Sequence, residues 1–197
     1  MKKLYLLLLT VFSLAAADAQ VQFGVKAGAN FSTLTGDNSE GIKTKVGFHA
    51  GALVSLPLFN EFSLQPEVVY SGQGYKFSGS GFTGTGSNSY VNVPVLFKYN
   101  NPTGFFAETG PQVGFLISAK AKMDGQDNVD TKDAYNSVDF SWALGIGYLI
   151  KPMNIGIDVR YNLGLSNVVK DSNAGSAKNS VFQVGVFYLF GEGAGAK

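Results

Sequence analysis

Apolar residues occupy every second position in eight segments of the chain. In the last of them, Val184 and Val186 alternate with Gln183 and Gly185. A period of two over about ten residues is typical of a β-strand, whereas a helix would repeat its apolar residues at three and four. The pattern therefore predicts an all-β fold. The predicted strands are residues 21–31, 47–56, 62–71, 91–99, 105–115, 139–148, 155–164 and 182–190.

The segments between the predicted strands alternate in length. Long polar stretches cover 35–44, 72–89, 119–138 and 166–179, and the short connections lie around 60–61, 100–103 and 151–154. Transmembrane barrels have short periplasmic turns and longer outer loops. The sequence therefore predicts an eight-stranded antiparallel up-and-down transmembrane β-barrel. Since the strand number is even, both termini are expected in the periplasm of a Gram-negative-type cell.

The apolar side chains on one face of each strand must be kept away from water. Either lipid surrounds them, or they line a sealed interior as in a secreted lipocalin-like barrel. The opposite phase is rich in Gly, Gln, Asn and Ser and poor in charge, which suits a crowded polar lumen better than a water-facing exterior. Aromatic residues gather near strand ends, as expected for interfacial girdles. Lipid is therefore the favoured cover. The expected rims are Phe23, Phe62, Tyr99, Phe105, Tyr148 and Tyr188 on the periplasmic side and Phe31, Phe48, Tyr70, Phe115 and Phe140 on the outer side.

Three prolines, Pro66, Pro94 and Pro111, fall inside predicted strands. Proline has no N–H to donate, and a closed barrel has no edge at which that loss is harmless. Local bulges or missing ladder bonds are expected around them.

Composition agrees with a membrane barrel and adds the domain boundaries. Only 15% of the 197 residues are charged, and 25 are glycine. A basic start, an apolar stretch and an A-x-A site predict a signal peptide over residues 1–19, followed by a barrel over 20–190 and a tail over 191–197. Removal of residues 1–19 leaves 13 basic and 13 acidic residues, so charge does not favour nucleic acid. The chain has no cysteine.

Five charged residues fall in the inward phase of the predicted strands. In a ring of eight strands the third and seventh lie opposite, so Arg160 can reach across the lumen toward Glu67 or Glu108. The planar guanidinium of arginine suits a bridge between two carboxylates. We interpret the group as a structural cluster that fills the lumen; a gated proton or ion path is the functional alternative. The cluster comprises Glu67, Lys98, Glu108, Asp158 and Arg160.

Catalytic, metal and cofactor chemistry is weakly supported. The lone histidine, His49, is expected as a hydrogen-bonded interior residue near the outer end. The acidic stretch 124–130 lacks the spacing of a calcium loop, and the glycine-rich stretch 79–86 does not join a strand to a helix as a phosphate loop does. We expect no enzyme, no cofactor and no metal.

Several short runs together resemble the PorT-like outer-membrane β-barrel family. They include residues 47–51, 63–76 and 92–99, continued by 110–112, 145–148 and 160–165. The resemblance covers nearly the whole mature chain and implies a small outer-membrane barrel; the name-giving member of the family is associated with a protein-secretion and gliding apparatus. The end of the chain also resembles the signal read by the barrel-assembly machinery. That signal would comprise Gln183, Gly185, Tyr188 and Phe190.

The function expected from the sequence is a non-enzymatic outer-membrane barrel with a structural, surface-interaction or accessory role in a secretion or envelope complex. Its partners would be outer-membrane lipid, the assembly machinery and a protein bound at the outer loops 72–89 and 119–138. A narrow porin-like channel and a secreted lipocalin-like ligand carrier remain as alternatives.

Overall fold

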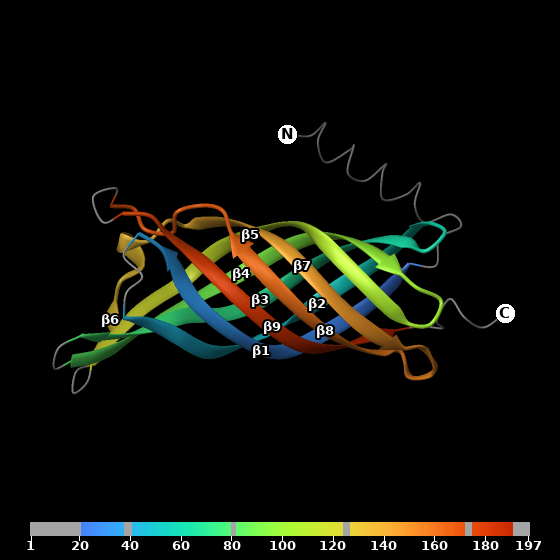
Figure 1. Cartoon of the computed structure of the whole chain (residues 1–197), viewed down its shortest axis with the longest axis horizontal. Coiled ribbons are helices and arrows are strands. Elements are labelled where there is room, and N and C mark those ends of the chain that lie inside the picture. The colour runs from blue at the N-terminus through green and yellow to red at the C-terminus, as the bar shows by residue number, and fades with distance from the viewer. Residues whose placement is uncertain (1–20, 38–40, 80–81, 124–126, 172–174, 191–197) are drawn as a thin grey trace.

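The computed structural model describes residues 21–37, 41–79, 82–123, 127–171 and 175–190. The predicted signal peptide, 1–19, and the predicted tail, 191–197, lie outside the described residues. Within them the fold is all-β, which confirms the predicted fold class (Figure 1). The strands are β1 (Gln22–Gly36), β2 (Ile42–Phe59), β3 (Phe62–Gly79), β4 (Phe82–Asn100), β5 (Phe105–Met123), β6 (Val129–Asp130), β7 (Val138–Ile150), β8 (Ile155–Gly164) and β9 (Ala177–Phe190).

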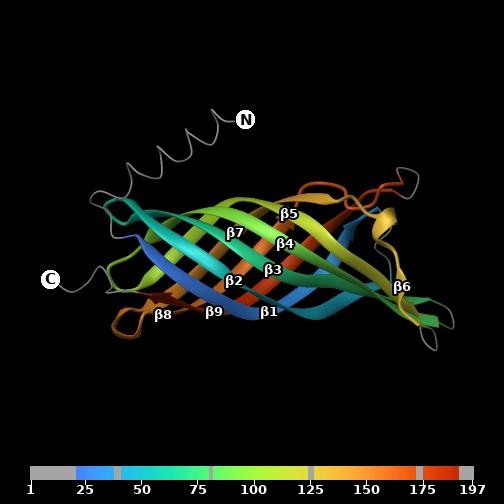
Figure 2. The ribbon, with the colours of Figure 1, turned by 180° about the vertical axis from the view of Figure 1, so that it is seen from behind.

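Eight of these strands form one closed antiparallel ring. Its order is β1, β2, β3, β4, β5, β7, β8, β9, and β9 pairs again with β1. The short β6 adds to the outer part of β5 only. Figures 1 and 2 show the strands crossing the barrel axis at a steep tilt. Each strand of the ring pairs with a neighbour on both sides, as a lipid-embedded sheet requires.

The two ends of the barrel differ. The turns β2–β3, β4–β5 and β7–β8 lie at one end together with the start of β1 and the end of β9, and we call this the short-turn end (Figure 1). The other connections lie at the opposite, long-loop end. Short turns use left-handed residues such as Asn60 and Asn154, with φ of 47° and 54°. Asparagine tolerates this conformation better than most residues, which explains its place in tight turns.

The outer face of the ring is apolar and the lumen is polar. Val184 is 43% exposed, whereas Glu67 and Arg160 are each 2% exposed. A lipocalin-like barrel would have the opposite arrangement, with apolar residues inside and charges outside. The predicted lipid-facing phase is therefore confirmed.

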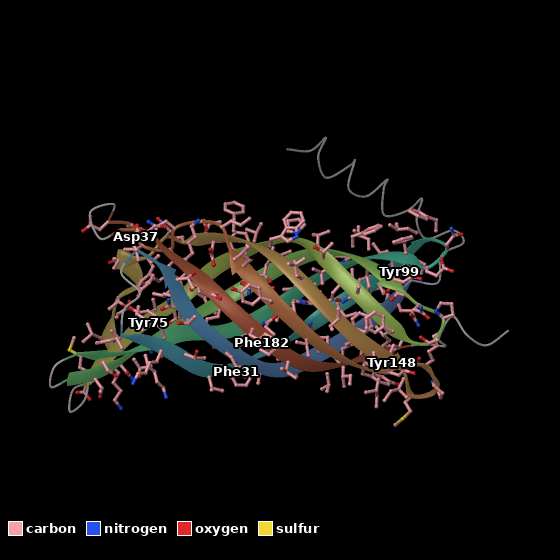
Figure 3. All side chains as sticks on the ribbon, in the orientation of Figure 1. Phe31, Asp37, Tyr75, Tyr99, Tyr148 and Phe182 are labelled. Carbon is pink, nitrogen blue, oxygen red and sulfur yellow. The ribbon has the colours of Figure 1, made fainter. Side chains whose placement is uncertain are left out.

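Aromatic side chains ring the outer face at two levels. In Figure 3, Tyr99 and Tyr148 lie toward the short-turn end, while Phe31 and Phe182 lie nearer the long-loop end. Phe62 stacks on Phe97 with ring centroids 5.1 Å apart, and Phe31 lies 6.3 Å from Phe182. Amphipathic and aromatic rings at two levels are what the interfaces of a bilayer favour.

The prediction of a loop at 72–89 is wrong, because the described residues of this stretch pair as a β-hairpin. β3 continues to Gly79 and β4 begins at Phe82, with register pairs up to Gly79↔Phe82. The inward rings of Tyr75 and Phe77 lie over Gly86 and Gly84 on the neighbouring strand, where a Cβ would collide with them. Aromatic cover of a cross-strand glycine stabilises such a strand although its composition is that of a loop.

The other long connections are also shorter than predicted. In the predicted loop 119–138, β5 runs to Met123, and β6 and a 3-10 turn, η1 (Lys132–Ala134), follow. In the same way β1 continues to Gly36, and β9 begins at Ala177. The strands therefore extend well beyond the apolar belt at the long-loop end.

Pro66, Pro94 and Pro111 lie in or beside interrupted ladders whose register does not shift, whereas a fourth proline, Pro57, borders a register shift. In the β3–β4 pair the ladder lacks the rungs between Pro66↔Val95 and Val69↔Asn92, and in the β4–β5 pair those between Pro94↔Gln112 and Phe97↔Thr109. The missing ladder bonds expected there are present, whereas the register shifts lie elsewhere. They occur at Thr44/His49, Pro57/Phe59 and Ser89/Tyr90.

Candidate functional site

Six charged side chains meet inside the barrel. They comprise three cations and three carboxylates, each at most 4% exposed, so that the formal charges cancel. A buried ion without a partner is very costly, so a balanced set is the form in which charges can fill a lumen. The charge cluster, as we call it, consists of Lys26, Glu67, Lys98, Glu108, Asp158 and Arg160.

Arg160 on β8 binds both glutamates. Its Nη1 and Nη2 donate to Oε2 and Oε1 of Glu67 on β3, each at 2.9 Å. Its Nε donates to Glu108 Oε1 on β5 at 2.8 Å. The ring order places β8 opposite β3, as the strand count predicts. One guanidinium therefore connects three strands, using its planar array of donors.

Lys26 on β1 belongs to the same cluster, although the sequence interpretation omitted it. Its Nζ lies 3.5 Å from Glu67 Oε2 and 3.5 Å from Asp158 Oδ2. Lys26 is in the inward phase of its strand, so its side was readable from the alternation. Its depth was not, because depth depends on the stagger between strands.

Lys98 is held differently from the other two cations. Its ammonium lies 3.6 Å from the centre of the Phe106 ring and 4.8 Å from that of Phe187, and it donates to Gln65 Oε1 at 3.1 Å. Cation–π contact strengthens when the cation is desolvated. Lys98 therefore joins the charge cluster to an apolar layer.

That apolar layer closes the short-turn end of the lumen. We call it the short-turn plug; it consists of Leu53, Phe106, Phe187 and Leu189. Phe106 and Phe187 pack edge to face with centroids 5.8 Å apart, and each lies over a cross-strand glycine, Gly147 or Gly156. Glycine makes room for the two rings inside a narrow barrel.

Above the charge cluster lies a layer of hydrogen-bonded amides with His49. Asn30 Oδ1 accepts from His49 Nδ1 at 2.7 Å and from Gln183 Nε2 at 2.8 Å. Gln183 Oε1 accepts in turn from Asn162 at 2.9 Å. His49 is 1% exposed, so it is the interior histidine that was expected. Among the residues that the structure describes, no serine or other nucleophile is hydrogen-bonded to its ring.

A second apolar cluster closes the long-loop end. This long-loop plug includes Tyr135 and Val168, which come from two connections that fold over the opening. Asn136 N donates to Val168 O at 2.8 Å, and Lys170 N donates to Ala134 O at 3.0 Å. The full set is Leu34, Tyr90, Leu116, Ala119, Tyr135 and Val168.

The layers follow one another along a single strand. On β1 the inward residues Lys26, Asn30 and Leu34 belong in turn to the charge cluster, the amide layer and the long-loop plug. The described lumen therefore holds successive layers of side chains along its length, in line with the narrow interior of an eight-stranded barrel.

The residues of the predicted assembly signal divide between two faces. Gln183 is buried in the amide layer, and Gly185 lies where a Cβ would come within 3.0 Å of Asp158 Oδ1 and of His49 Nε2. Tyr188 and Phe190 point outward at the rim, with centroids 5.3 Å apart. The motif thus serves the fold of the last strand. Its recognition by the assembly machinery stays a prediction.

Metal ligands do not gather in the described part of the chain. There, no group of three or more His, Cys, Asp or Glu side chains is arranged to hold an ion. Within the same residues no helix is both long and apolar enough to cross a membrane.

A family model described as outer membrane protein beta-barrel domain matches residues 15–170, well over half of the chain. The chain belongs to this family. It is a small barrel of the outer membrane, and its apolar outer face and plugged lumen do not favour a secreted lipocalin-like carrier or a narrow porin-like channel. Comparison with curated proteins found no match.

Two solved bacterial structures are similar to this chain, and the first of them shares its fold. Neisserial surface protein A is 15% identical, with a TM-score of 0.54, and the alignment covers 85% of this chain and 97% of that one. The attachment invasion locus protein Ail of Yersinia pestis is 17% identical, with a TM-score of 0.47 and coverage of 86% and 98%. At these identities the likeness concerns the fold alone.

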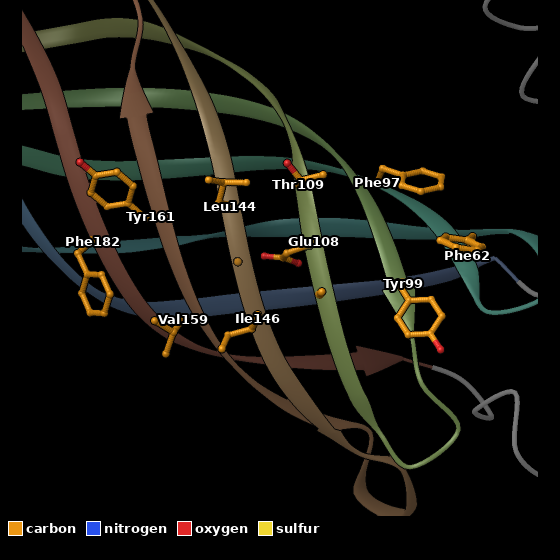
Figure 4. A pocket seen from close by; sticks show the side chains of 12 residues that line it. Phe62, Phe97, Tyr99, Glu108, Thr109, Leu144, Ile146, Val159, Tyr161 and Phe182 are labelled. Atoms are coloured by element: carbon orange, nitrogen blue, oxygen red, sulfur yellow. The ribbon is translucent and has the colours of Figure 1, made fainter.

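The outer face of this outer-membrane barrel carries an apolar groove of about 560 Å³ (Figure 4). Side chains such as Tyr99, Ile146 and Val159 line it, between the small residues Ala107 and Gly145. Leu144 and Ile146 are 52% and 54% exposed, so the groove opens outward and not into the lumen. In a membrane such a groove is accessible to lipid chains.

Proposed function

We propose that this protein is a non-enzymatic, non-conducting surface barrel that presents its long-loop end to partners outside the cell. The observation that carries this proposal is the lumen, which two apolar plugs and a neutral charge cluster fill. Ions would have to cross both plugs, and His49 is buried between them, so a substrate would not reach it from either end. The proposal therefore assigns activity to the rim and not to the interior.

The proposed orientation places both termini in the periplasm. It is supported by the sorting of the connections, since the short turns share an end with the start of β1 and the end of β9. Short periplasmic turns are the rule in barrels of this type. The β3–β4 hairpin and the segments around η1 would then project from the cell surface.

The more specific part of the proposal is an accessory role in a secretion or envelope complex, as the resemblance to PorT-like proteins implies. The partner surface would be the hairpin 72–89 and the segment 119–138. Because the hairpin is a paired sheet, it offers a rigid surface, and its ordering costs little on binding.

Conductance tests the closed lumen. Purified protein in planar bilayers is expected to give no stepwise current under voltage. A reproducible current from wild-type protein would overturn the non-conducting part and favour a narrow channel instead.

Cysteine labelling tests the orientation, because the chain has no cysteine of its own. Ser78→Cys lies near the hairpin tip and Met153→Cys in the turn between β7 and β8, and both positions are exposed. In intact cells a membrane-impermeant maleimide should label only the Ser78→Cys variant. Labelling of only the Met153→Cys variant would reverse the orientation.

Partner capture tests the accessory role. Co-purification from native membranes is compared between wild type and a variant whose hairpin is shortened by removing matched residues from β3 and β4 above Gly72 and Ser89. Loss of a specific co-purifying protein from the shortened variant supports the proposal. An unchanged set of partners would remove the hairpin from it.

A further inference from the structure

Three lysines share one rung of the projecting sheet. Register pairs join Lys43 on β2 to Lys76 on β3, Lys76 to Thr85 on β4, and Thr85 to Lys122 on β5. Directly paired residues of an antiparallel sheet lie on the same face. Thr85 stands between the buried glycines Gly84 and Gly86, so this face is the outside of the barrel. All three lysines are exposed.

Carboxylates do not offset this rung among the residues that the structure describes. The ion pairs found there involve only Lys26 and Arg160, both inside the lumen. Lys120, on the neighbouring rung, differs because its register partner on β6 is Asp130. Like charges that face each other across a sheet are destabilising. Within the described residues, the lysine rung, consisting of Lys43, Lys76, Thr85 and Lys122, therefore carries a positive charge that no ion pair offsets.

The pKa of the neighbouring Lys45 is also affected by the positive charge of the rung. Lys45 is half-buried, and its Nζ donates to Gln73 O at 3.2 Å. Burial lowers the pKa of Lys45, and the positive charge of Lys76 lowers it further. An anion bound at the rung would relieve this repulsion.

The height of the rung decides between two anionic ligands. On β4 the outward residues change from polar to apolar between Ser89 and Val91. Thr85 lies six residues beyond Val91. At about 3.3 Å per residue and a tilt of about 40°, Thr85 lies about 15 Å above the apolar belt of β4, and Lys43 lies about 8 Å above the exposed Val46 on β2. The headgroup layer of a bilayer is only about 5 to 7 Å thick on each side.

The width of the rung also favours an extended anionic ligand over a single lipid headgroup. Four strands at about 4.8 Å spacing spread its charges over about 14 Å. One phosphate cannot contact all of them, whereas an extended chain with repeated anionic groups can. A polymer also gains from several weak contacts made together.

We propose that the lysine rung binds an anionic polysaccharide, one that carries sulfate, phosphate or carboxylate groups and lies in the sugar layer outside the membrane. The lysines contact the anionic groups, and the Thr85 hydroxyl donates a hydrogen bond between them. The location of this binding, outside the cell, depends on the proposed orientation of the barrel. The affinity of the lysines for an anionic polymer does not depend on it.

Binding to a defined polymer tests the rung. Full-length mature protein in phosphatidylcholine nanodiscs is titrated with dextran sulfate, with neutral dextran as the uncharged control. Wild type should bind dextran sulfate alone, more weakly as salt rises. Lys76→Gln/Lys122→Gln should weaken binding about tenfold.

A matched variant controls for net charge. Lys170→Gln/Lys178→Gln removes two lysines from the same end of the barrel but from the β8–β9 side, and should change binding less than about twofold. Equal loss in both variants would overturn the site, as would wild-type binding to phosphatidylglycerol vesicles without binding to dextran sulfate. Both variants should keep the heat-modifiable band of a folded barrel. Nanodiscs expose both ends of the barrel, so this binding assay does not depend on the orientation in the cell. A negative result would therefore overturn the lysine rung as a binding site without affecting the proposed orientation.

Discussion

Arg160 and Glu67 form a two-point ion pair across the full width of the barrel, with both N–O distances at 2.9 Å. They lie on strands that are opposite in the ring and 93 residues apart in sequence. The pair therefore connects walls that share no backbone hydrogen bond. Its carboxylate also faces Lys26, so the contact is part of a balanced set and not an isolated bridge.

Arg160→Leu is expected to destabilise the barrel by about 3 to 5 kcal/mol, since it leaves three buried carboxylates facing two cations. Urea unfolding in detergent, followed by the shift of the folded band on a gel, measures the loss. Membrane location should not change. Glu67→Leu/Arg160→Leu restores the charge balance and should be more stable than the single variant. A single variant with wild-type stability would contradict a structural role for the cluster.

Gly156→Ala is expected to loosen the short-turn plug. A methyl group at this position collides with the ring of Phe187, and overpacking of a filled core costs about 1 to 3 kcal/mol. Urea unfolding again gives the magnitude. The second change in Gly156→Ala/Phe187→Leu makes room for the methyl group and should recover part of the loss. If the double variant is less stable than Gly156→Ala alone, the Phe187 ring is not the group with which the introduced methyl group would collide.

Gly84→Val is expected to fray the β3–β4 hairpin while leaving the barrel folded. Its side chain would occupy the place of the Phe77 ring, which packs directly on Gly84. Amide hydrogen exchange should accelerate over residues 74–87 and remain unchanged in β7 and β8. Thr85→Val, one position away and pointing outward, is the matched control and should keep wild-type exchange. Equal protection in both variants would show that the glycine is not required.

Alkaline pH is expected to open the long-loop plug through Tyr135. Burial raises the pKa of Tyr135, and its hydrogen bond with the Tyr75 hydroxyl, at 2.9 Å, raises it further. The folded state thus favours the protonated phenol. The contribution of the protonated phenol to the free energy of unfolding is fully present below the pKa of the unfolded state, about 10. It is lost as the pH rises through the higher pKa of the folded state. A tyrosinate absorbance titration of wild type against Tyr135→Phe should show one late step missing from the variant.

The alternation of the sequence was enough to predict the ring, its lipid face and the inward side of most charged residues. Val184 and Arg160 illustrate why, since a period of two fixes the side of every residue once one face is assigned. The count of strands also placed Arg160 opposite Glu67, with Glu108 as the alternative partner and the stagger of the barrel left open; in the structure Arg160 binds both glutamates.

Depth and loop conformation were not readable in the same way. Lys26 joins the cluster because of the stagger between strands, which a single strand does not reveal. The hairpin 72–89 has a loop-like composition, and only the cross-strand contact of Phe77 with Gly84 makes it a sheet. The plug residues Tyr135 and Val168 come from connections without periodicity, so their inward place depended on tertiary packing.

The seam between the first and last strands has a consequence for how the molecule is made. β1 pairs with β9 from Phe23↔Phe190 to Gly36↔Ala177, so the ring stays open until the last strand is available. An open sheet in lipid would leave a row of bare amide and carbonyl groups. We therefore expect the barrel to close only after the last strand has been made, and a chain truncated before residue 177 to form no closed barrel.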